Sequence, residues 1–286
     1  MNNKQKQIEH DFFVNLNEGG IMFHHPPLGR TVSSVLFLAF CFVLSMLPRQ
    51  SNAANEMPPV ETNTQRFSVS LGTTRVIYDL DSIGQSLTVT NPQDYPILVQ
   101  SRVLTGDMKS KAPFVVTPPL FRLDGQHQSS LRIVRIGGHF AKDRESLQWL
   151  CVKGIPPKED SAWAKDKDGK PVISKKVSLN LQLSVDTCIK LLVRPENIKG
   201  HPDDVASSLS WYRQGEWLKA VNDTPFYMNL SSLKMGGINI PNMHYIAPFS
   251  SYTFPLPKSA SGKVFWTIVT DYGGVSNVYQ ADLKRS

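Results

Sequence analysis

The sequence predicts an all-β protein built from two β-sandwich domains. Short segments that alternate apolar and polar residues recur along the chain, and turns rich in Pro, Gly and Asn separate them. No strand is followed by the amphipathic helix that a parallel sheet would need. The strand-like segments are 67–71, 75–78, 86–90, 96–104, 114–117, 129–136, 147–153, 209–212, 217–221, 226–230, 252–254 and 264–270.

The N-terminal segment has the features of a signal peptide. Residues 35–47 are thirteen almost wholly apolar residues, which is too short to span a bilayer but suits a signal sequence. Arg30 supplies positive charge ahead of them, and small residues fit cleavage after Ala53. We therefore expect residues 1–53 to be removed, with translation starting at Met1 or Met22. The alternative is a buried helix of a cytosolic protein.

Charge and cysteine content narrow the class of protein. The net charge of the full sequence, +7, is mild, so it does not indicate a nucleic-acid partner. Cleavage removes Cys41 and leaves Cys151 and Cys188, and an even pair in an exported protein predicts one disulfide. No later stretch reaches 18 uninterrupted apolar residues, so we expect no stable membrane insertion after cleavage.

A Pro- and Gly-rich segment divides the mature chain. Residues 194–202 hold two prolines and a glycine, which is typical of a stiff linker, so we expect domains at 54–197 and 198–286. About 85 residues follow the linker, slightly under the size of an immunoglobulin-like sandwich. Within the first domain, residues 158–176 interleave Lys and Asp, and we interpret them as a solvated, mobile loop rather than a nucleic-acid surface.

The segment 177–193 has the most regular alternation in the chain. Period-two alternation places its odd-numbered apolar side chains on one face of a strand. A single strand over this segment would run about 56 Å at 3.3 Å per residue. The usual strand has about five or six residues, so this one would overrun its domain. Such a strand could pair with another chain, or its row could fill the core of its own domain. The first five members of the row are Val177, Leu179, Leu181, Leu183 and Val185.

The motifs of common enzyme classes are missing from the sequence. It contains no G-x-S-x-G, no phosphate-binding P-loop and no G-x-G-x-x-G. The histidines show no metal-ligand spacing, and the cluster 143–146 resembles a turn held by local ion pairs. We therefore expect a protein that is not an enzyme and that needs no cofactor and no metal.

Several short stretches along the mature chain form one set of motifs. They are 74–78, 91–96, 116–119 with 122–123, 143–146, 154–157, 189–195, 224–227 and 271–274. In this order they resemble the PapD-like periplasmic chaperones, which assemble surface fibres in Gram-negative bacteria. The long loop before the 177–193 strand resembles the subfamily that builds capsule-like or afimbrial adhesin fibres. The resemblance implies two immunoglobulin-like sandwiches in a boomerang arrangement.

The resemblance also implies roles for individual residues. Arg75 and Lys190 match the pair that anchors the C-terminal carboxylate of a fibre subunit. The 177–185 row matches the strand donated to that subunit, and a disulfide would join the strands of Cys151 and Cys188. Two further sets match the family: a second binding edge at Phe67, Val69 and Leu71, and a proline pair, Pro156 and Pro157, that holds the donor strand in the free chaperone.

The expected function is that of a periplasmic chaperone that folds and caps fibre subunits by donor-strand complementation and delivers them to an outer-membrane usher. The alternative is a displayed two-domain adhesin or structural subunit. Such a subunit should carry an N-terminal donor extension and lack the pairing of Arg75 with Lys190. The sequence leaves open the identity of the cognate subunit and whether the free chain self-associates to cover its apolar row.

Overall fold

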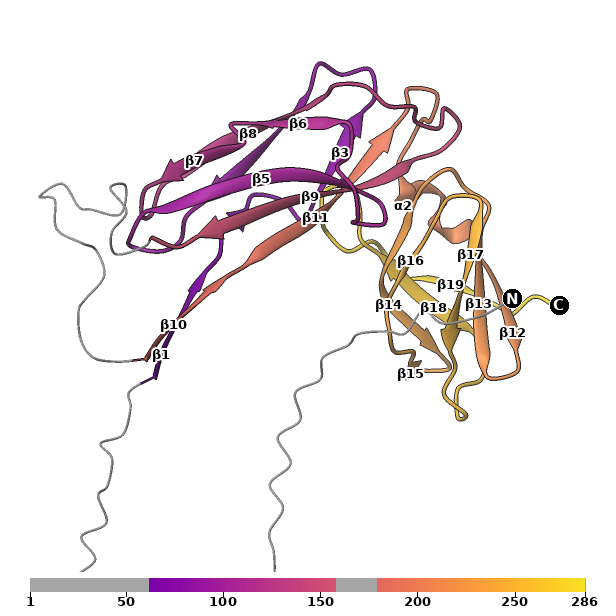
Figure 1. Ribbon diagram of the computed structural model, residues 1–286. Coiled ribbons are helices and arrows are strands. Elements are labelled where there is room, and N and C mark those ends of the chain that lie inside the picture. The colour runs from indigo at the N-terminus through magenta and orange to yellow at the C-terminus, as the bar shows by residue number, and fades with distance from the viewer. Residues whose placement is uncertain (1–61, 158–178, 286) are drawn as a thin grey trace, which may run out of the picture. The chain divides into compact units, whose positions relative to one another are not determined.

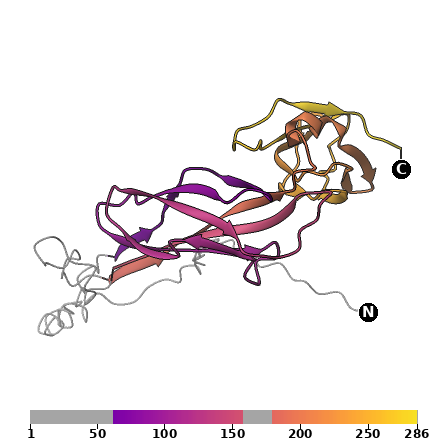
Figure 2. The ribbon, with the colours of Figure 1, turned by 90° about the horizontal axis from the view of Figure 1, so that it is seen from above.

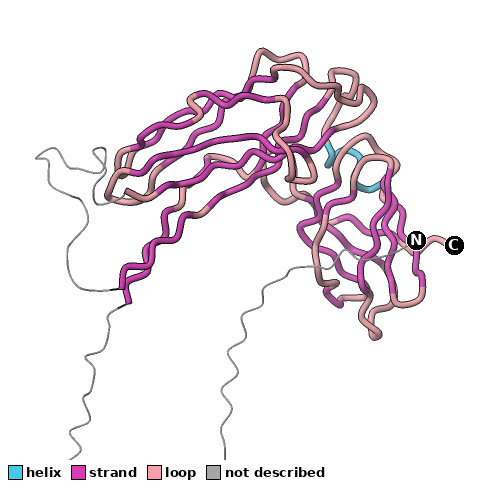
Figure 3. The backbone as a smooth tube through the Cα atoms, in the orientation of Figure 1, coloured by secondary structure: helices cyan, strands magenta, loops and turns pink. Residues whose placement is uncertain are grey.

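The computed structural model describes residues 62–157 and 179–285, which belong to one compact unit (Figure 1). The expected signal peptide, the charged loop 158–176 and Val177 lie outside the described residues. Strands dominate the described part of the chain, and its helical content is confined to a short segment after β11 (Figure 3). No described helix has the length and apolar character needed to cross a membrane.

The first sandwich consists of two sheets whose alternating strands enclose one core. In β5 the side chains of Ile97, Val99 and Val103 point inward, while the residues between them are more exposed. One sheet has the order β3 (Arg75–Asp79), β11 (Asp186–Arg194), β9 (Ser146–Ile155), β5 (Ile97–Thr105), β7 (Leu120–Leu123). The other has the order β2 (Ser70–Leu71), β4 (Gln85–Thr90), β8 (Gln128–Arg135), β6 (Phe114–Thr117).

The second sandwich has its own core, which contains two tryptophans in contact with each other. Trp211 and Trp266 are fully buried, with ring centroids 5.2 Å apart. One sheet has the order β12 (Ser210–Gln214), β13 (Trp217–Asn222), β17 (Ser250–Pro255). The other has the order β15 (Ile238–Asn239), β14 (Met228–Met235), β18 (Val264–Ile268), β19 (Tyr279–Ala281), and β16 (Tyr245–Ile246) also pairs with β14. The two groups of strands are distinct in both ribbon views (Figures 1 and 2), so the predicted all-β, two-sandwich fold is confirmed.

The expected linker contains a short helix. The turn α2 (Pro202–Val205) starts with proline, whose missing N–H is no loss at a helix start. The Asp204 carboxylate accepts the backbone N–H of His201 at 2.8 Å, which satisfies a donor ahead of the first turn. A 3₁₀ turn at Ala206–Ser208 follows and leads into β12.

The long strand predicted over 177–193 is two strands, which corrects that expectation. β10 (Leu179–Ser184) pairs in parallel with β1 (Thr62–Phe67), and the two run side by side as a separate sheet (Figure 1). β11 pairs instead with β9 and β3. Val185 lies between them: its N–H donates to the Phe67 carbonyl at 3.0 Å, and its carbonyl accepts the Gly154 N–H at 3.3 Å. The chain therefore leaves the pairing with β1 and enters the pairing with β9 and β3 at Val185, which is held by these two backbone hydrogen bonds.

Each sandwich uses one fully buried asparagine to hold a turn. Asn91 Nδ2 donates to the carbonyls of Tyr95 at 2.8 Å and of Leu123 and Asp124 at 3.1 Å. In the second sandwich, Asn222 does the same through the acceptors Phe226 (2.8 Å), Ala247 (3.0 Å) and Ile246 (3.2 Å). One buried amide group therefore contacts three loop carbonyls in each domain, which fixes the loops that the sequence showed only as turn signals.

Replacing Asn222 with alanine should lower the free energy of unfolding by about 2 kcal/mol, because three buried carbonyls lose their donor. Urea denaturation followed by tryptophan fluorescence measures the loss. The control is Asn239→Ala, which truncates an exposed asparagine in β15. Equal midpoints for the two variants would contradict the role assigned to the buried amide.

Candidate functional site

Arg75 and Lys190 are neighbours on adjacent parallel strands. The parallel register of β3 and β11 pairs Arg75 with Lys190 directly, and β9 places Trp149 opposite Lys190 on the other side. Paired residues point to the same face of a sheet, so these three side chains form one row. The residues that flank Lys190, Ile189 and Leu191, point into the core. The alternation of β11 therefore presents the lysine on the outer face.

Both cations of this row are partly or wholly buried. Arg75 is 8% exposed; its Nη1 donates to the Val269 carbonyl of the second sandwich at 3.2 Å, and its Nε has no hydrogen-bond partner. Burial lowers the pKa of Arg75, opposed by the nearby charges of Asp271 and Glu145. The pKa of Lys190 is lowered by burial and by the positive charge of Arg75.

The pair has the chemistry of a carboxylate site. Among the ion pairs within residues 62–157 and 179–285, none includes Arg75 or Lys190. A carboxylate placed between them would accept charge-assisted hydrogen bonds from a guanidinium and an ammonium, which are the stronger kind. It would also give the buried Arg75 Nε an acceptor.

A second charged group, which the sequence reasoning missed, lies on the same face of β11. Arg194 Nη2 contacts Glu145 Oε1 at 2.6 Å, and Arg194 Nη1 contacts Asp271 Oδ2 at 2.7 Å. Glu145 is 2% exposed, and its other oxygen accepts the backbone N–H of Tyr227 at 2.7 Å. Since Glu145 precedes β9 and Asp271 follows β18, this network joins the two sandwiches.

The network shifts the pKa values of its members. Burial raises the pKa of Glu145, with Arg194 acting in the opposite direction. Burial would also raise the pKa of Asp271, but hydrogen bonds from Arg194 and His201 bring it below its usual value. The hydrogen bond to Asp271, 2.8 Å long, raises the pKa of the half-exposed His201.

The expectation of local ion pairs at 143–146 is correct only for its exposed members. Arg144 and Asp143 form a surface pair at 2.7 Å, whereas Glu145 points to Arg194, 49 positions along the chain. Glu145 and Asp271 lie in the stretches 143–146 and 271–274, which resemble the family. This resemblance was the only indication in the sequence that they have a role. Nothing in their spacing showed that they converge on one arginine.

The predicted donor row is only partly described. Leu183 is 41% exposed and Val185 is half-buried, while β10 contains Leu179 and Leu181, whose side chains lie outside the description. The alternative that the row fills its own core therefore fails for Leu183. The proline pair, Pro156 and Pro157, follows directly after β9, and Pro157 is buried.

The second predicted edge has most of its side chains in the core. Phe67 is 1% exposed and packs on Tyr95 with ring centroids 5.3 Å apart, and Val69 is 6% exposed. Leu71 is half-buried against the same core. The side chains of Phe67 and Val69 are buried in this conformation, so a partner that bound this edge would contact the backbone instead.

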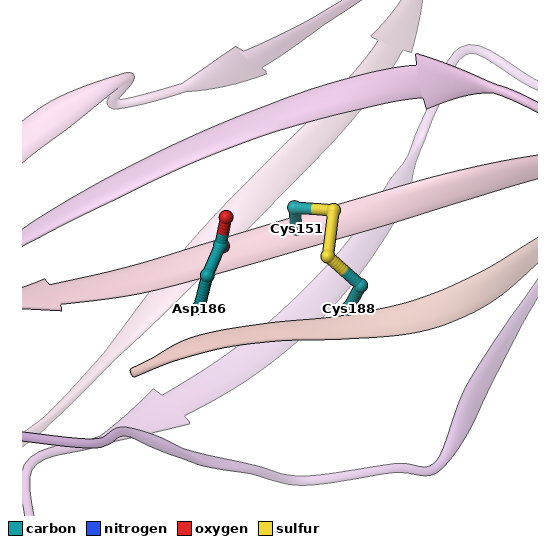
Figure 4. A group of neighbouring side chains, drawn as sticks. All are labelled: Cys151, Asp186 and Cys188. Atoms are coloured by element: carbon teal, nitrogen blue, oxygen red, sulfur yellow. A yellow bond between two sulfur atoms is a disulfide. The ribbon is translucent and has the colours of Figure 1, made fainter. Parts of the chain in front are cut away.

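The structure contains the predicted disulfide between Cys151 and Cys188, which pair directly across β9 and β11 (Figure 4). Asp186 lies beside it, and the three side chains are close enough to hold a metal ion. The two sulfur atoms are bonded to each other, so neither is the thiolate that a metal requires. Asp186 itself is paired with Arg102. We therefore assign no metal site to this group.

Two family sequence models match the chain. The model described as "Pili and flagellar-assembly chaperone, PapD N-terminal domain" matches residues 68–199. The model described as "Pili assembly chaperone PapD, C-terminal domain" matches residues 204–280. Together they cover the two sandwiches.

Individual chaperones are also similar to the chain. Chaperone protein AfaB of Escherichia coli is 64% identical over 197 residues, which are 69% of this chain and 79% of that protein. The E. coli chaperone DraB is 58% identical, with a TM-score of 0.69 over 78% of this chain and 100% of DraB. A structure of the Salmonella enterica SafA pilin in complex with the SafB chaperone matches at 45% identity and a TM-score of 0.67, over 78% of this chain and 99% of that one.

Replacing His201 with glutamine should destabilise the protein at about pH 5 and have little effect at about pH 8. A raised pKa in the folded state means that the stabilising charge is fully present below the ordinary histidine value and lost as the pH rises through the raised one. Because His201 is half exposed, the effect should be at most about 1 kcal/mol. Melting temperatures across this range measure it, with His139→Gln, an exposed histidine outside the network, as control. A variant whose melting-temperature difference grows with pH would refute the assignment.

Proposed function

The chain belongs to the PapD-like family of pilus-assembly chaperones, and from that premise we propose that it folds and caps subunits of a surface fibre by donating a strand. It would act in the periplasm, between export of the subunit and delivery to an outer-membrane usher. The long segment before β10 supports the subfamily that builds capsule-like or afimbrial fibres. The domain limits 54–197 and 198–286, after removal of residues 1–53, belong to the same proposal.

The observation that carries the proposal is the buried pair of cations without a carboxylate partner. Arg75 and Lys190 lie in register, and the ion pairs of the described residues leave both unpaired. Leaving a buried charge unpaired is costly, so such a pair persists where a ligand completes it. The C-terminal carboxylate of a fibre subunit is a ligand that fits this position.

Strand β10 supplies the second half of the site. It pairs with β1 on one edge in a sheet of two strands, so in the described part of the chain its other edge is available to an incoming strand. A subunit strand that paired with this edge would gain backbone hydrogen bonds, and a groove in the subunit would receive the apolar side chains of the row. The two strands form a sheet of their own, separate from the sheets of both sandwiches, and this leaves β10 accessible for donation.

Two features distinguish this function from that of a displayed subunit. The described residues contain the pairing of Arg75 with Lys190, and the apolar row is internal to the chain. The solved complex of the SafB chaperone with the SafA pilin supports a subunit as partner. Donation of a strand needs no cofactor and no ATP, because folding of the subunit supplies the driving free energy, and no part of this proposal involves nucleic acid.

Replacing Lys190 with alanine should prevent recovery of a soluble complex with the subunit. Loss of a charge-assisted bond to a carboxylate corresponds to a weakening of about 100-fold. Co-purification with the fibre subunits encoded by neighbouring genes measures capture, with Lys234→Ala, an exposed lysine on β14, as control. Normal recovery of the Lys190 variant would eliminate the anchor.

Replacing Leu181 and Leu183 together with serine should weaken capture by more than about 100-fold, because each buried leucine contributes about 1.5–3 kcal/mol. The exposed position of Leu183 means that the fold itself should tolerate the change. The same co-purification, together with a melting curve, measures both effects. A matched control is Leu120→Ser, which alters an exposed leucine of β7. Unchanged subunit capture by the double variant would show that β10 is not the donated strand.

A further inference from the structure

The ammonium group of Lys190 lies between two aromatic rings that come from different sandwiches. Its Nζ is 5.5 Å from the centroid of Trp149 and 5.4 Å from that of Tyr245. Trp149 is in β9 of the first sandwich and Tyr245 in β16 of the second. Both distances are within the range of about 6 Å in which a cation is attracted to a ring face.

The tryptophan ring is held in place by its own strand. The antiparallel register of β9 and β11 sets Trp149 directly opposite Lys190. The indole Nε1 donates to the Gly106 carbonyl at 3.1 Å, which fixes the orientation of the ring. The Trp149 contact is therefore built into the same sheet as the lysine.

The tyrosine ring is held by a stack of aromatic side chains that leads into the second core. Tyr245 packs edge-on against Tyr227, with ring centroids 5.5 Å apart, and lies tilted against His244 at 4.3 Å. His244 stacks almost parallel on Tyr252 at 4.3 Å, and Tyr252 contacts the fully buried Phe254 at 4.8 Å. The ring near Lys190 is thus tied to the interior of the second sandwich.

These rings meet a specific electrostatic need of the site. The charge of Arg75 on the neighbouring strand repels the Lys190 ammonium, and burial disfavours it further. A carboxylate partner within the chain would solve both problems but would also occupy the position of the ligand. The face of a ring attracts the cation without neutralising it, so the ammonium keeps its donors for an incoming carboxylate.

We propose that Trp149 and Tyr245 are positioning residues that hold the Lys190 ammonium ready for the carboxylate of the subunit. This inference rests on the proposed function and adds to it that the second sandwich takes part in capture through one ring. The hydroxyl of Tyr245 is not required; the face of the ring is. Tyr245→Phe should therefore behave as wild type, whereas Tyr245→Leu should not.

The first test needs no subunit. In the free protein, ring currents should move the NMR signals of the Lys190 methylene protons next to Nζ upfield of their ordinary position. The shift should persist in Tyr245→Phe and shrink in Tyr245→Leu, with Tyr272→Leu, a strongly exposed tyrosine, as control. An unchanged shift in Tyr245→Leu would overturn the proposal, and melting curves establish that each variant is folded.

The second test measures capture of the co-expressed fibre subunit by the same variants. Tyr245→Leu should weaken it by about 2- to 30-fold, the range expected for one cation–ring contact, and Tyr245→Phe should restore it. If Lys190→Ala prevents capture but Tyr245→Leu leaves it unchanged, the positioning role is overturned and the proposed function stands. If Lys190→Ala captures normally, the carboxylate anchor of the proposed function fails and the positioning role fails with it.

Discussion

The bond between Arg194 and its two carboxylates is the interaction on which the rest of the site depends. Its guanidinium binds Glu145 of the first sandwich and Asp271 of the second, so it fixes residues of both domains around the end of β11. Lys190 is four residues earlier on the same strand and on the same face, because side chains alternate along β11. The ion pairs of Arg194 therefore also place Lys190 beside β16, within reach of the Tyr245 ring.

The charges around this strand leave room for one more anion. Arg75, Lys190 and Arg194 carry three positive charges, and Glu145 and Asp271 supply two negative ones. The remaining positive charge falls on Arg75 and Lys190. Besides the nearby charges of Asp271 and Glu145, which Arg194 binds directly, the two cations receive a carbonyl and two ring faces. Buried charge without a partner is costly, and a single carboxylate would balance it.

Local pattern predicted most of the strands but not the long-range contacts. Alternation located β5 and β8, whose buried faces follow period two, whereas two-residue strands such as β16 are too short to show a period. Arg75 and Lys190 were found through family resemblance, because a lone strand cation is ordinarily a surface charge. Glu145 and Asp271 were not assigned, since they lie 49 and 77 positions from Arg194 and a buried network of such distant residues is decided by tertiary packing. The break at Val185 escaped prediction for the same reason: hydrogen bonds to Phe67 and Gly154 create it.

The proposed carboxylate anchor would also set which side chains a bound subunit receives. Side chains alternate with a period of two, so a slip of one residue would replace the apolar row with the polar residues between its members. Leu183 precedes Lys190 by seven residues, a span of about 23 Å at 3.3 Å per residue, and Val185 is fixed by hydrogen bonds between them. Under the proposed function, a subunit whose C-terminus is held at Lys190 would therefore meet the row in one register. Such an anchor would contribute specificity as well as affinity, because a chain end bound there could not slide along the donated strand.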